Sequence, residues 1–196
     1  AAAVILMRSA VAPARNSARP AILGVGCASD RVRLGDRVNP EWFSSKTLAG
    51  KAAFAMAGIG PQDVDVAELY DAYTGAELQA IAAYGFVPPE QVGQQSFGAG
   101  DRLAVNLSGG LLGQGGAPGA TGIAQIVALA RILTGRFWLQ PQRTPRFALA
   151  DAHGAQEAFV TGTFGGLTPV RSIDDRVLPA ALPGPVTARL RALYDE

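Results

Sequence analysis

The stretch VNLSGGLLGQGGAPGATG, residues 105–122, decides how this chain folds. Seven of the fourteen residues from Gly109 to Gly122 are glycine, and the helical pattern IAQIVALARIL follows directly at 123–133. Glycine permits positive φ angles and lets a ligand approach the main chain closely. A helix N-terminus adds N–H donors without helical partners and a partial positive charge. Such a junction suits a bound phosphate, or the oxygen of a carbonyl or thioester during a reaction.

The composition narrows the class of protein. The chain has 196 residues, of which 48% are hydrophobic, and a formal net charge of +1. This length suffices for one sizeable core or two small ones. The near-neutral charge, with scattered arginines, favours neither nucleic acid nor an anionic membrane as a partner. The single cysteine, Cys27, excludes an internal disulfide framework and a cysteine-rich metal site, and it fits a reducing cytoplasm.

Apolar runs and helical patterns alternate in the first part of the chain. Ala1–Arg8 and Ala21–Ala28 predict two apolar strands, and a start inside a strand predicts a further segment upstream. A helix is predicted from Ser44 or Ser45, which can cap it, to about Gly58. Its expected apolar face consists of Leu48, Ala52, Ala55 and Met56.

The remaining elements indicate a layered α/β domain. Val64–Tyr70 predicts a strand, and Thr74 to about Tyr84 predicts a helix with a capping box formed by Thr74 and Glu77. Phe147–Asp151 and Glu157–Thr163 predict a hairpin-like pair of strands. Strands that alternate with helices are typical of layered α/β folds.

A change in composition near residue 166 predicts a domain boundary. Prolines stand at positions 169, 179, 183 and 185, and a helical pattern begins at Thr187. Proline-rich segments of this kind commonly link domains. We expect one domain over 1–165 and a linker or tail over 166–196 that leads toward a further domain.

Three segments, taken in order, resemble the C-terminal half of the thiolase superfamily. AAAVILM at 1–7 resembles the strand that opens this half. DVDVAELYDAYTGAELQAIAAYGF at 63–86 resembles the segment that brings an Asn or Asp to the active site. VNLSGGLLGQGGAPGATGIAQ at 105–125 resembles the segment with the catalytic His in a Gly-His-Pro motif. The sterol-carrier-protein-type thiolases and the lipid-transfer-protein-like steroid side-chain aldolases are the most similar branches.

This resemblance implies one half of a five-layer αβαβα sandwich, with a mixed sheet covered by helices, in an enzyme that is normally a dimer. It implies coenzyme A thioesters as substrates and no covalently bound cofactor. It also implies an upstream half that carries a nucleophilic Cys. In the aldolase branch it further implies a partner protein with a zinc ribbon and an OB-fold that binds acyl-CoA.

The chain departs from the family pattern at two positions. Gly116 stands where the family has its catalytic His, and the late Cys or His position falls on or near Asp151. Since thiolysis needs a nucleophile and a proton-transfer partner, these departures favour the aldolase-like branch. They also leave open an alternative, a non-catalytic subunit that stabilises or regulates an active partner.

The expected catalytic residues are Asp71, Tyr73 and His153. Asp71 is either an oxyanion-site or water-holding residue or an aspartate that bonds its own turn. A tyrosine such as Tyr73 can act as a general acid in a retro-aldol step, although a buried, hydrogen-bonded hydroxyl is the commoner fate. His153 either transfers protons or lies on a surface turn, and Asp151 is an alternative base.

A second set of residues is expected to contact substrate, chiefly through the backbone. The alternative role for this glycine loop is close packing against the other half of the sandwich. The expected contacts are Tyr70, Ser108, Gly109, Gly110, Gly116 and Gly119.

The predicted function is C–C bond cleavage or formation on acyl-CoA, by acyl transfer or retro-aldol chemistry, in lipid or sterol side-chain metabolism.

Overall fold

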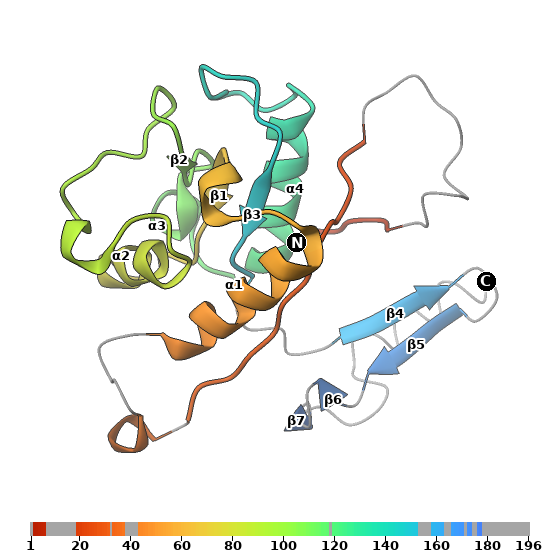
Figure 1. The fold of residues 1–196 in the computed structure, drawn as a ribbon. Coiled ribbons are helices and arrows are strands. Elements are labelled where there is room, and N and C mark those ends of the chain that lie inside the picture. The colour runs from red at the N-terminus through yellow and green to blue at the C-terminus, as the bar shows by residue number, and fades with distance from the viewer. Residues whose placement is uncertain are drawn as a thin grey trace. The chain divides into compact units, whose positions relative to one another are not determined.

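The computed structural model describes residues 2–6, 19–31, 33–37, 43–117, 119–152, 158–162, 166–170, 172–173 and 176–177. The chain divides into two units, Ala1–His153 and Gly154–Glu196. The elements of the first unit, shown in Figure 1, follow in chain order: η1 (Leu34–Asp36), α1 (Ser44–Ala57), η2 (Pro61–Asp63), β1 (Val66–Glu68), α2 (Thr74–Ala83), η3 (Pro89–Gln91), β2 (Ala104–Val105), α3 (Gly110–Gln114), α4 (Thr121–Leu133) and β3 (Ala148–Ala150).

A three-stranded sheet forms the centre of this unit, in the order β2-β1-β3. Both pairings are parallel, with Val66 opposite Ala104 on one side and Glu68 opposite Ala150 on the other. The carboxyl ends of all three strands therefore meet at one edge of the sheet. The predicted α/β class is confirmed.

Helices cover both faces of the sheet, and β1 alternates between them. Ala67 belongs to a core cluster with Ile81 of α2, whereas Val66 belongs to a second cluster with Leu129 and Ile132 of α4. Figure 1 shows α4 running beside β3, which it contacts. Burial of a side chain such as Ile81 contributes about 1.5–3 kcal/mol. The alternation places Glu68 on the same face as Val66, toward α4.

Helix α4 forms as the sequence predicts. Its buried side chains are spaced three or four residues apart, which is the spacing of one helix face. The helix begins two residues before the predicted start, at Thr121, and ends at Leu133. The buried positions are Gln125, Ala128, Leu129 and Ile132.

Helix α1 is also confirmed, but two predictions about it were wrong. Ser44 and Ser45 do not cap it, because Phe43 occupies the N-cap position and its side chain forms no capping hydrogen bond, and its buried face is not the predicted one. Gly58 ends the helix in the left-handed conformation with φ of 68°. Leu48 and Met56 are 58% and 66% exposed, whereas Lys46 and Gly50 are buried. A Cβ atom on Gly50 would lie 2.7 Å from the Tyr84 ring. The helix therefore packs closely against Tyr84, at the end of α2, through Gly50. The pattern of hydrophobic residues alone predicted a different face of the helix as the buried one.

Helix α2 begins at Thr74, as expected, but the predicted capping box is not formed. Tyr73 occupies the N-cap position, and no side-chain hydrogen bond caps this end of the helix. Glu77 instead lies partly buried near Asp71, and burial followed by the charge of Asp71 raises the pKa of Glu77. The prediction assigned the cap one residue too late, to Thr74 rather than Tyr73.

The two strands predicted near the N-terminus are not found in the described residues of those segments. Residues 2–6 and 21–28 have no strand assignment, and Ile5, Leu6, Ile22 and Val25 are exposed. The second segment lies against α1 through glycine. A Cβ atom on Gly26 would approach the Ala49 carbonyl oxygen to 1.8 Å. Apolar composition predicted strands here, but a strand needs a pairing neighbour.

We expect the change Gly26→Ala to lower the free energy of unfolding by about 1–3 kcal/mol, because its Cβ would force the segment away from α1. Gly35→Ala is the matched control, because a Cβ there meets nothing within 4 Å. Urea unfolding followed by circular dichroism measures both changes. Equal unfolding midpoints for the two variants would contradict the described contact.

The second unit contains two antiparallel pairs in its described residues. β4 (Ala158–Gly162) pairs with β5 (Gly166–Val170), and β6 (Ser172–Ile173) pairs with β7 (Arg176–Val177). The sequence predicted a hairpin between Phe147–Asp151 and Glu157–Thr163. That pairing was wrong, because β3 pairs with β1 and β4 with β5. The domain boundary at residue 165 stays a prediction. None of the helices in the described residues has the length and apolar character to cross a bilayer.

Candidate functional site

Buried carboxylates gather at the carboxyl edge of the sheet. Glu68 ends β1, Asp71 follows it, and Asp151 follows β3 directly. All three are buried, and Glu68 and Asp71 are only 1% and 2% exposed. Ligands of parallel α/β sheets commonly bind beyond the carboxyl ends of the strands. This edge is therefore the candidate site, and its charged groups need partners in the fold.

Asp71 holds the glycine loop in place. The Leu111 backbone N–H donates to Asp71 Oδ1 at 2.7 Å, at the start of α3. Gly109 and Gly110 precede it with φ angles of 96° and 58°, which non-glycine residues rarely adopt. A Cβ on Gly110 would lie 2.0 Å from Asp71 Oδ2. The loop therefore wraps around the carboxylate at a distance that glycine alone allows.

Glu68 forms a second anchor, with Ser108. The Ser108 backbone N–H donates to Glu68 Oε1 at 3.0 Å, and the Ser108 hydroxyl donates to Glu68 Oε2. The Gln114 amide donates in turn to Ser108 Oγ. Burial raises the pKa of Glu68, and the charge of Asp71 raises it further, against the lowering effect of the Ser108 hydrogen bonds. Glu68 is therefore a stronger base than an exposed glutamate.

A cavity of about 150 Å³ lies beside Glu68. Its wall is formed by the end of β1, by α3 and the loop after it, by the first turns of α4, including Thr121 and Gln125, and by Ala2 near the N-terminus. The α4 N-terminus has no side-chain capping hydrogen bond. Among the described residues that line the cavity, Glu68 alone has a titratable side chain. The cavity can therefore offer a ligand the N-terminus of α4, the carboxyl group of Glu68 and the side-chain amide of Gln125.

Asp151 accepts hydrogen bonds from three donors. Lys46 Nζ forms an ion pair with Asp151 Oδ2, Tyr84 OH donates to Oδ1 at 2.7 Å, and Tyr70 N–H donates to Oδ2 at 3.1 Å. Lys46 also lies 5.4 Å from the centre of the Phe43 ring. Burial and the charge of Asp151 raise the pKa of Tyr84, so its hydroxyl stays protonated. The cluster ties α1, α2 and β3 to the turn that carries Tyr70 and Asp71.

Asn106 joins the ends of β1 and β2. It has a φ of 51°, a conformation that Asn tolerates better than most residues. Its Oδ1 accepts the Leu69 N–H at 2.7 Å, and its buried Nδ2 has no partner among the described residues. Asn106 thereby fixes the spacing between the strand ends that carry Glu68 and Ser108.

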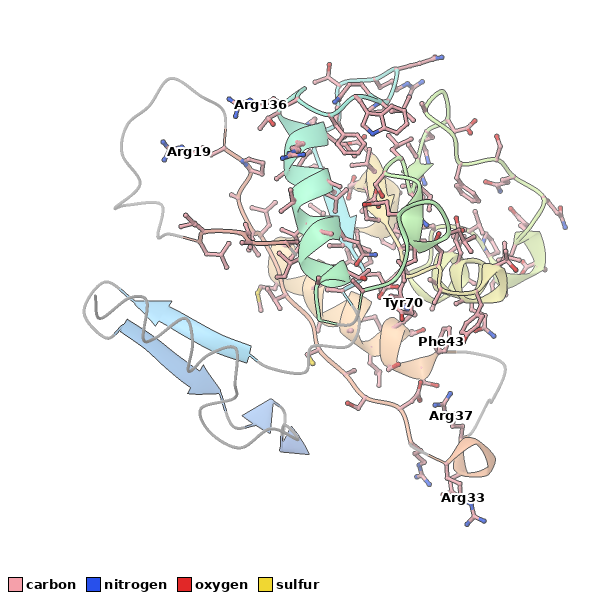
Figure 2. All side chains as sticks on the ribbon, turned by 180° about the vertical axis from the view of Figure 1, so that it is seen from behind. Arg19, Arg33, Arg37, Phe43, Tyr70 and Arg136 are labelled. Carbon is pink, nitrogen blue, oxygen red and sulfur yellow. The ribbon has the colours of Figure 1, made fainter. Side chains whose placement is uncertain are left out.

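The structure brings some of the predicted site residues together. Asp71, Ser108, Gly109 and Gly110 meet at the carboxyl edge through the contacts given above. Figure 2 shows Tyr70 at this end of the unit and Arg136 at the opposite end.

The other predicted residues are exposed or lie outside the described residues. Tyr73 is 79% exposed, and Gly116 and Gly119 lie in the exposed loop between α3 and α4. His153 lies outside the described residues. The roles of all these residues stay predictions.

The sequence did not identify Glu68 or Gln125 as site residues, and it did not identify the contacts that Lys46 and Tyr84 each make with Asp151. Glu68 had a signal, because a charged residue inside the buried strand pattern VDVAELY needs a partner. Gln125 interrupts the apolar face of α4 in the same way. Lys46 had none, because its partner Asp151 is 105 residues away.

Comparison with known proteins agrees with this architecture. Residues 26–161 match a family model described as thiolase C-terminal domain-like. Sterol carrier protein 2 of Rattus norvegicus is 37% identical over 91 residues, which cover 44% of this chain and 17% of the relative. Acetyl-CoA acetyltransferase of Methanocaldococcus jannaschii is 35% identical over 105 residues, 50% of this chain and 27% of the relative.

Two further matches are a CoA lyase and the solved structure of an aldolase. The 17-hydroxy-3-oxo-4-pregnene-20-carboxyl-CoA lyase of Mycobacterium tuberculosis is 30% identical over 139 residues, 66% of this chain and 36% of the lyase. A solved structure of an Ltp2-ChsH2(DUF35) aldolase covers 62% of this chain and 33% of its own, with a TM-score of 0.55 and 25% identity. The chain thus spans between 17% and 36% of these curated relatives. The resemblance noted from the sequence is confirmed, and the chain belongs to the thiolase C-terminal domain-like family.

Proposed function

We propose that this domain binds an acyl-CoA thioester at the carboxyl edge of its sheet and serves retro-aldol cleavage of a C–C bond in a lipid or sterol side chain. The observation that carries the proposal is the cavity between Glu68 and the N-terminus of α4. The helix N-terminus suits an oxygen that gains negative charge. The names of two relatives, a CoA acetyltransferase and a CoA lyase, support the thioester class.

The residue at position 116 supports the retro-aldol branch over thiolysis. Gly116 provides no imidazole where the thiolase pattern has its catalytic His. A retro-aldol reaction needs a base for the substrate hydroxyl and donors for the thioester oxygen of the enolate that forms. We assign proton transfer to Tyr73 and His153, and substrate contact to Tyr70, Ser108 and the glycines 109, 110, 116 and 119. Asp71 positions the loop that carries them.

Exposed apolar side chains support the proposal that this protein binds other protein chains. Leu48 and Met56 on α1, and Ile22 and Val25 beside it, expose large apolar surfaces that commonly mark protein interfaces. We propose an upstream thiolase-like half, a second copy of the protein, and an acyl-CoA-binding protein with an OB-fold and zinc ribbon as partners. The two-component name of the Ltp2-ChsH2(DUF35) aldolase supports the last of these. We propose a cytoplasmic location for this assembly.

We expect Asp71→Ala in the full-length protein to lower kcat/KM for a 3-hydroxyacyl-CoA about 100-fold, because the loop loses its anchor at Leu111 N and misplaces the donors. Mass spectrometry of the carbonyl product and the shortened acyl-CoA measures the reaction. Asp36→Ala, in exposed η1, is the control and should keep wild-type activity.

Tyr73→Phe and His153→Ala complete the test of the assigned site. If the wild-type protein cleaves the substrate and none of the three variants loses activity, the assignment of these residues is wrong. If the wild-type protein, assayed with its partner, produces no carbonyl product, the proposed reaction itself is wrong.

Gly116 also favours a second candidate, a non-catalytic thiolase-like subunit. In that case the protein shows no turnover alone, and its addition raises the activity or the unfolding temperature of a separate catalytic partner. Co-purification followed by assays of each component with and without the other distinguishes this candidate from the first.

A further inference from the structure

The cavity beside Glu68 contains a buried amide oxygen without a partner. Gln125 of α4 lines the cavity and is 4% exposed, and its Oε1 makes no hydrogen bond within the described structure. Its Nε2 donates to the Glu68 carbonyl oxygen at 3.3 Å. Because a carbonyl oxygen only accepts, this contact fixes the amide orientation and leaves the acceptor unpaired. A buried acceptor without a donor is costly, so this position suits a ligand that brings one.

Glu68 is well placed to exchange a proton in the same cavity. Its side chain is shielded from bulk water, and it is bonded to Ser108 through both oxygens. The charged groups nearest to it along the strand ends are Asp71, after β1, and Asp151, whose N–H donates to the Glu68 carbonyl at 2.9 Å. The loop after β2 and helix α4 face it with the uncharged Ser108 and Gln125.

We propose that Glu68 is the base that removes the substrate's hydroxyl proton in the cavity, with Tyr73 and His153 left as the proton donors, and that Gln125 selects thioesters with a hydroxyl group at carbon 3. This inference rests on the proposed function, because it assigns the steps of the retro-aldol reaction. A 3-hydroxyacyl thioester brings a donor to Gln125 Oε1 when it binds, and its single hydroxyl hydrogen then turns from Gln125 to Glu68 before it is removed. A 3-oxoacyl thioester, the substrate of thiolysis, brings only acceptors at carbons 1 and 3, and leaves that oxygen unpaired.

The proposed step balances without a further reactant. The Glu68 carboxylate removes the proton of the 3-hydroxyl group, and the oxygen–hydrogen electron pair forms the new carbonyl bond. The C2–C3 bond breaks, and its electrons become the enolate of the thioester. Tyr73 or His153 gives a proton to C2 and regains one from Glu68 by way of solvent, so the products are a carbonyl compound and a shortened acyl thioester, and the carboxylate is restored.

The first arm of the test concerns Glu68, in the full-length protein with a 3-hydroxyacyl-CoA. Glu68→Gln preserves shape, and we expect kcat to fall about 100- to 10,000-fold with little change in KM. In the wild type, kcat should rise with pH as Glu68 loses its proton, and this rise should disappear in Glu68→Gln. Glu68→Asp should recover part of kcat. The matched control Glu90→Gln, on exposed η3, should leave kcat and its pH profile unchanged.

The second arm concerns Gln125 and measures binding instead of turnover. We expect Gln125→Leu to weaken binding of the 3-hydroxyacyl-CoA by about 3- to 10-fold, the value of one neutral hydrogen bond. It should leave binding of the matched acyl-CoA without the hydroxyl group unchanged. Isothermal titration calorimetry measures both dissociation constants.

Each outcome has a defined meaning. The assignment of Glu68 is overturned if the Glu68→Gln protein keeps kcat within threefold of the wild type. It is also overturned if this variant no longer binds the acyl-CoA lacking the hydroxyl group, because that result shows a structural role. Equal weakening of both ligands by Gln125→Leu overturns the hydroxyl assignment. If the wild type does not turn over, the proposed function and the role of Glu68 fail, whereas the binding arm still decides the role of Gln125.

Discussion

Replacing Asp151 with alanine is expected to lower the free energy of unfolding by about 3–5 kcal/mol, because it leaves the ammonium group of Lys46 buried without its counter-ion. The same change removes the acceptor of Tyr84 OH and of Tyr70 N–H. Urea unfolding followed by circular dichroism measures the loss. The loss should equal or exceed that of any other single polar substitution at the strand ends, because three donors lose one acceptor.

The order of effects within this cluster provides the control. Lys46→Met should cost less, about 1.5–3 kcal/mol, because Asp151 keeps two donors and the methionine fills the space beside Phe43 and Tyr84. Lys51→Met, on the exposed side of α1, should leave the free energy of unfolding nearly unchanged. Losses of equal size for Lys46→Met and Asp151→Ala would show that the ion pair, rather than the three-donor arrangement, decides the stability of the cluster.

Gly110→Ala is expected to produce the second large effect, a loss of about 2–5 kcal/mol. A left-handed backbone costs a non-glycine residue about 1–2 kcal/mol, and overpacking adds about 1–3 kcal/mol. The new Cβ would meet Asp71 Oδ2 at 2.0 Å, and Gly110 is buried. The carboxylate would have to move away from Leu111 N, so thioester turnover should fall with stability.

Two neighbouring glycines separate the causes of that loss. Gly109→Ala has the strained φ of 96° but meets nothing closer than 3.6 Å, so it should cost only the backbone strain. Gly113→Ala lies within α3 and meets nothing within 4 Å, so it should be neutral or slightly stabilising. Unfolding midpoints should fall in the order Gly113→Ala, Gly109→Ala, Gly110→Ala. If Gly109→Ala is as damaging as Gly110→Ala, the contact with Asp71 is not the cause.

Local patterns predicted the elements that surround the site. The spacing of apolar residues gave α4, the glycines after Val105 gave the loop, and Asp71 was placed between a strand and a helix. The bounds of α1 were also correct, but its buried face was not. Leu48 and Met56 are exposed, because α1 contacts its neighbours through Gly50 and through the backbone at Ala49. A glycine contact has no hydrophobic signal in a sequence.

The sequence by itself determined the glycine loop, the helix after it, the central strand and the thiolase resemblance, because backbone freedom and side-chain periodicity are properties of neighbouring residues. Only the tertiary structure decided which polar groups share the site. The pairs Lys46–Asp151 and Glu68–Ser108 join residues 105 and 40 positions apart. Their contacts exist because parallel strands bring their carboxyl ends to one edge, where burial leaves each carboxylate dependent on a donor from another element.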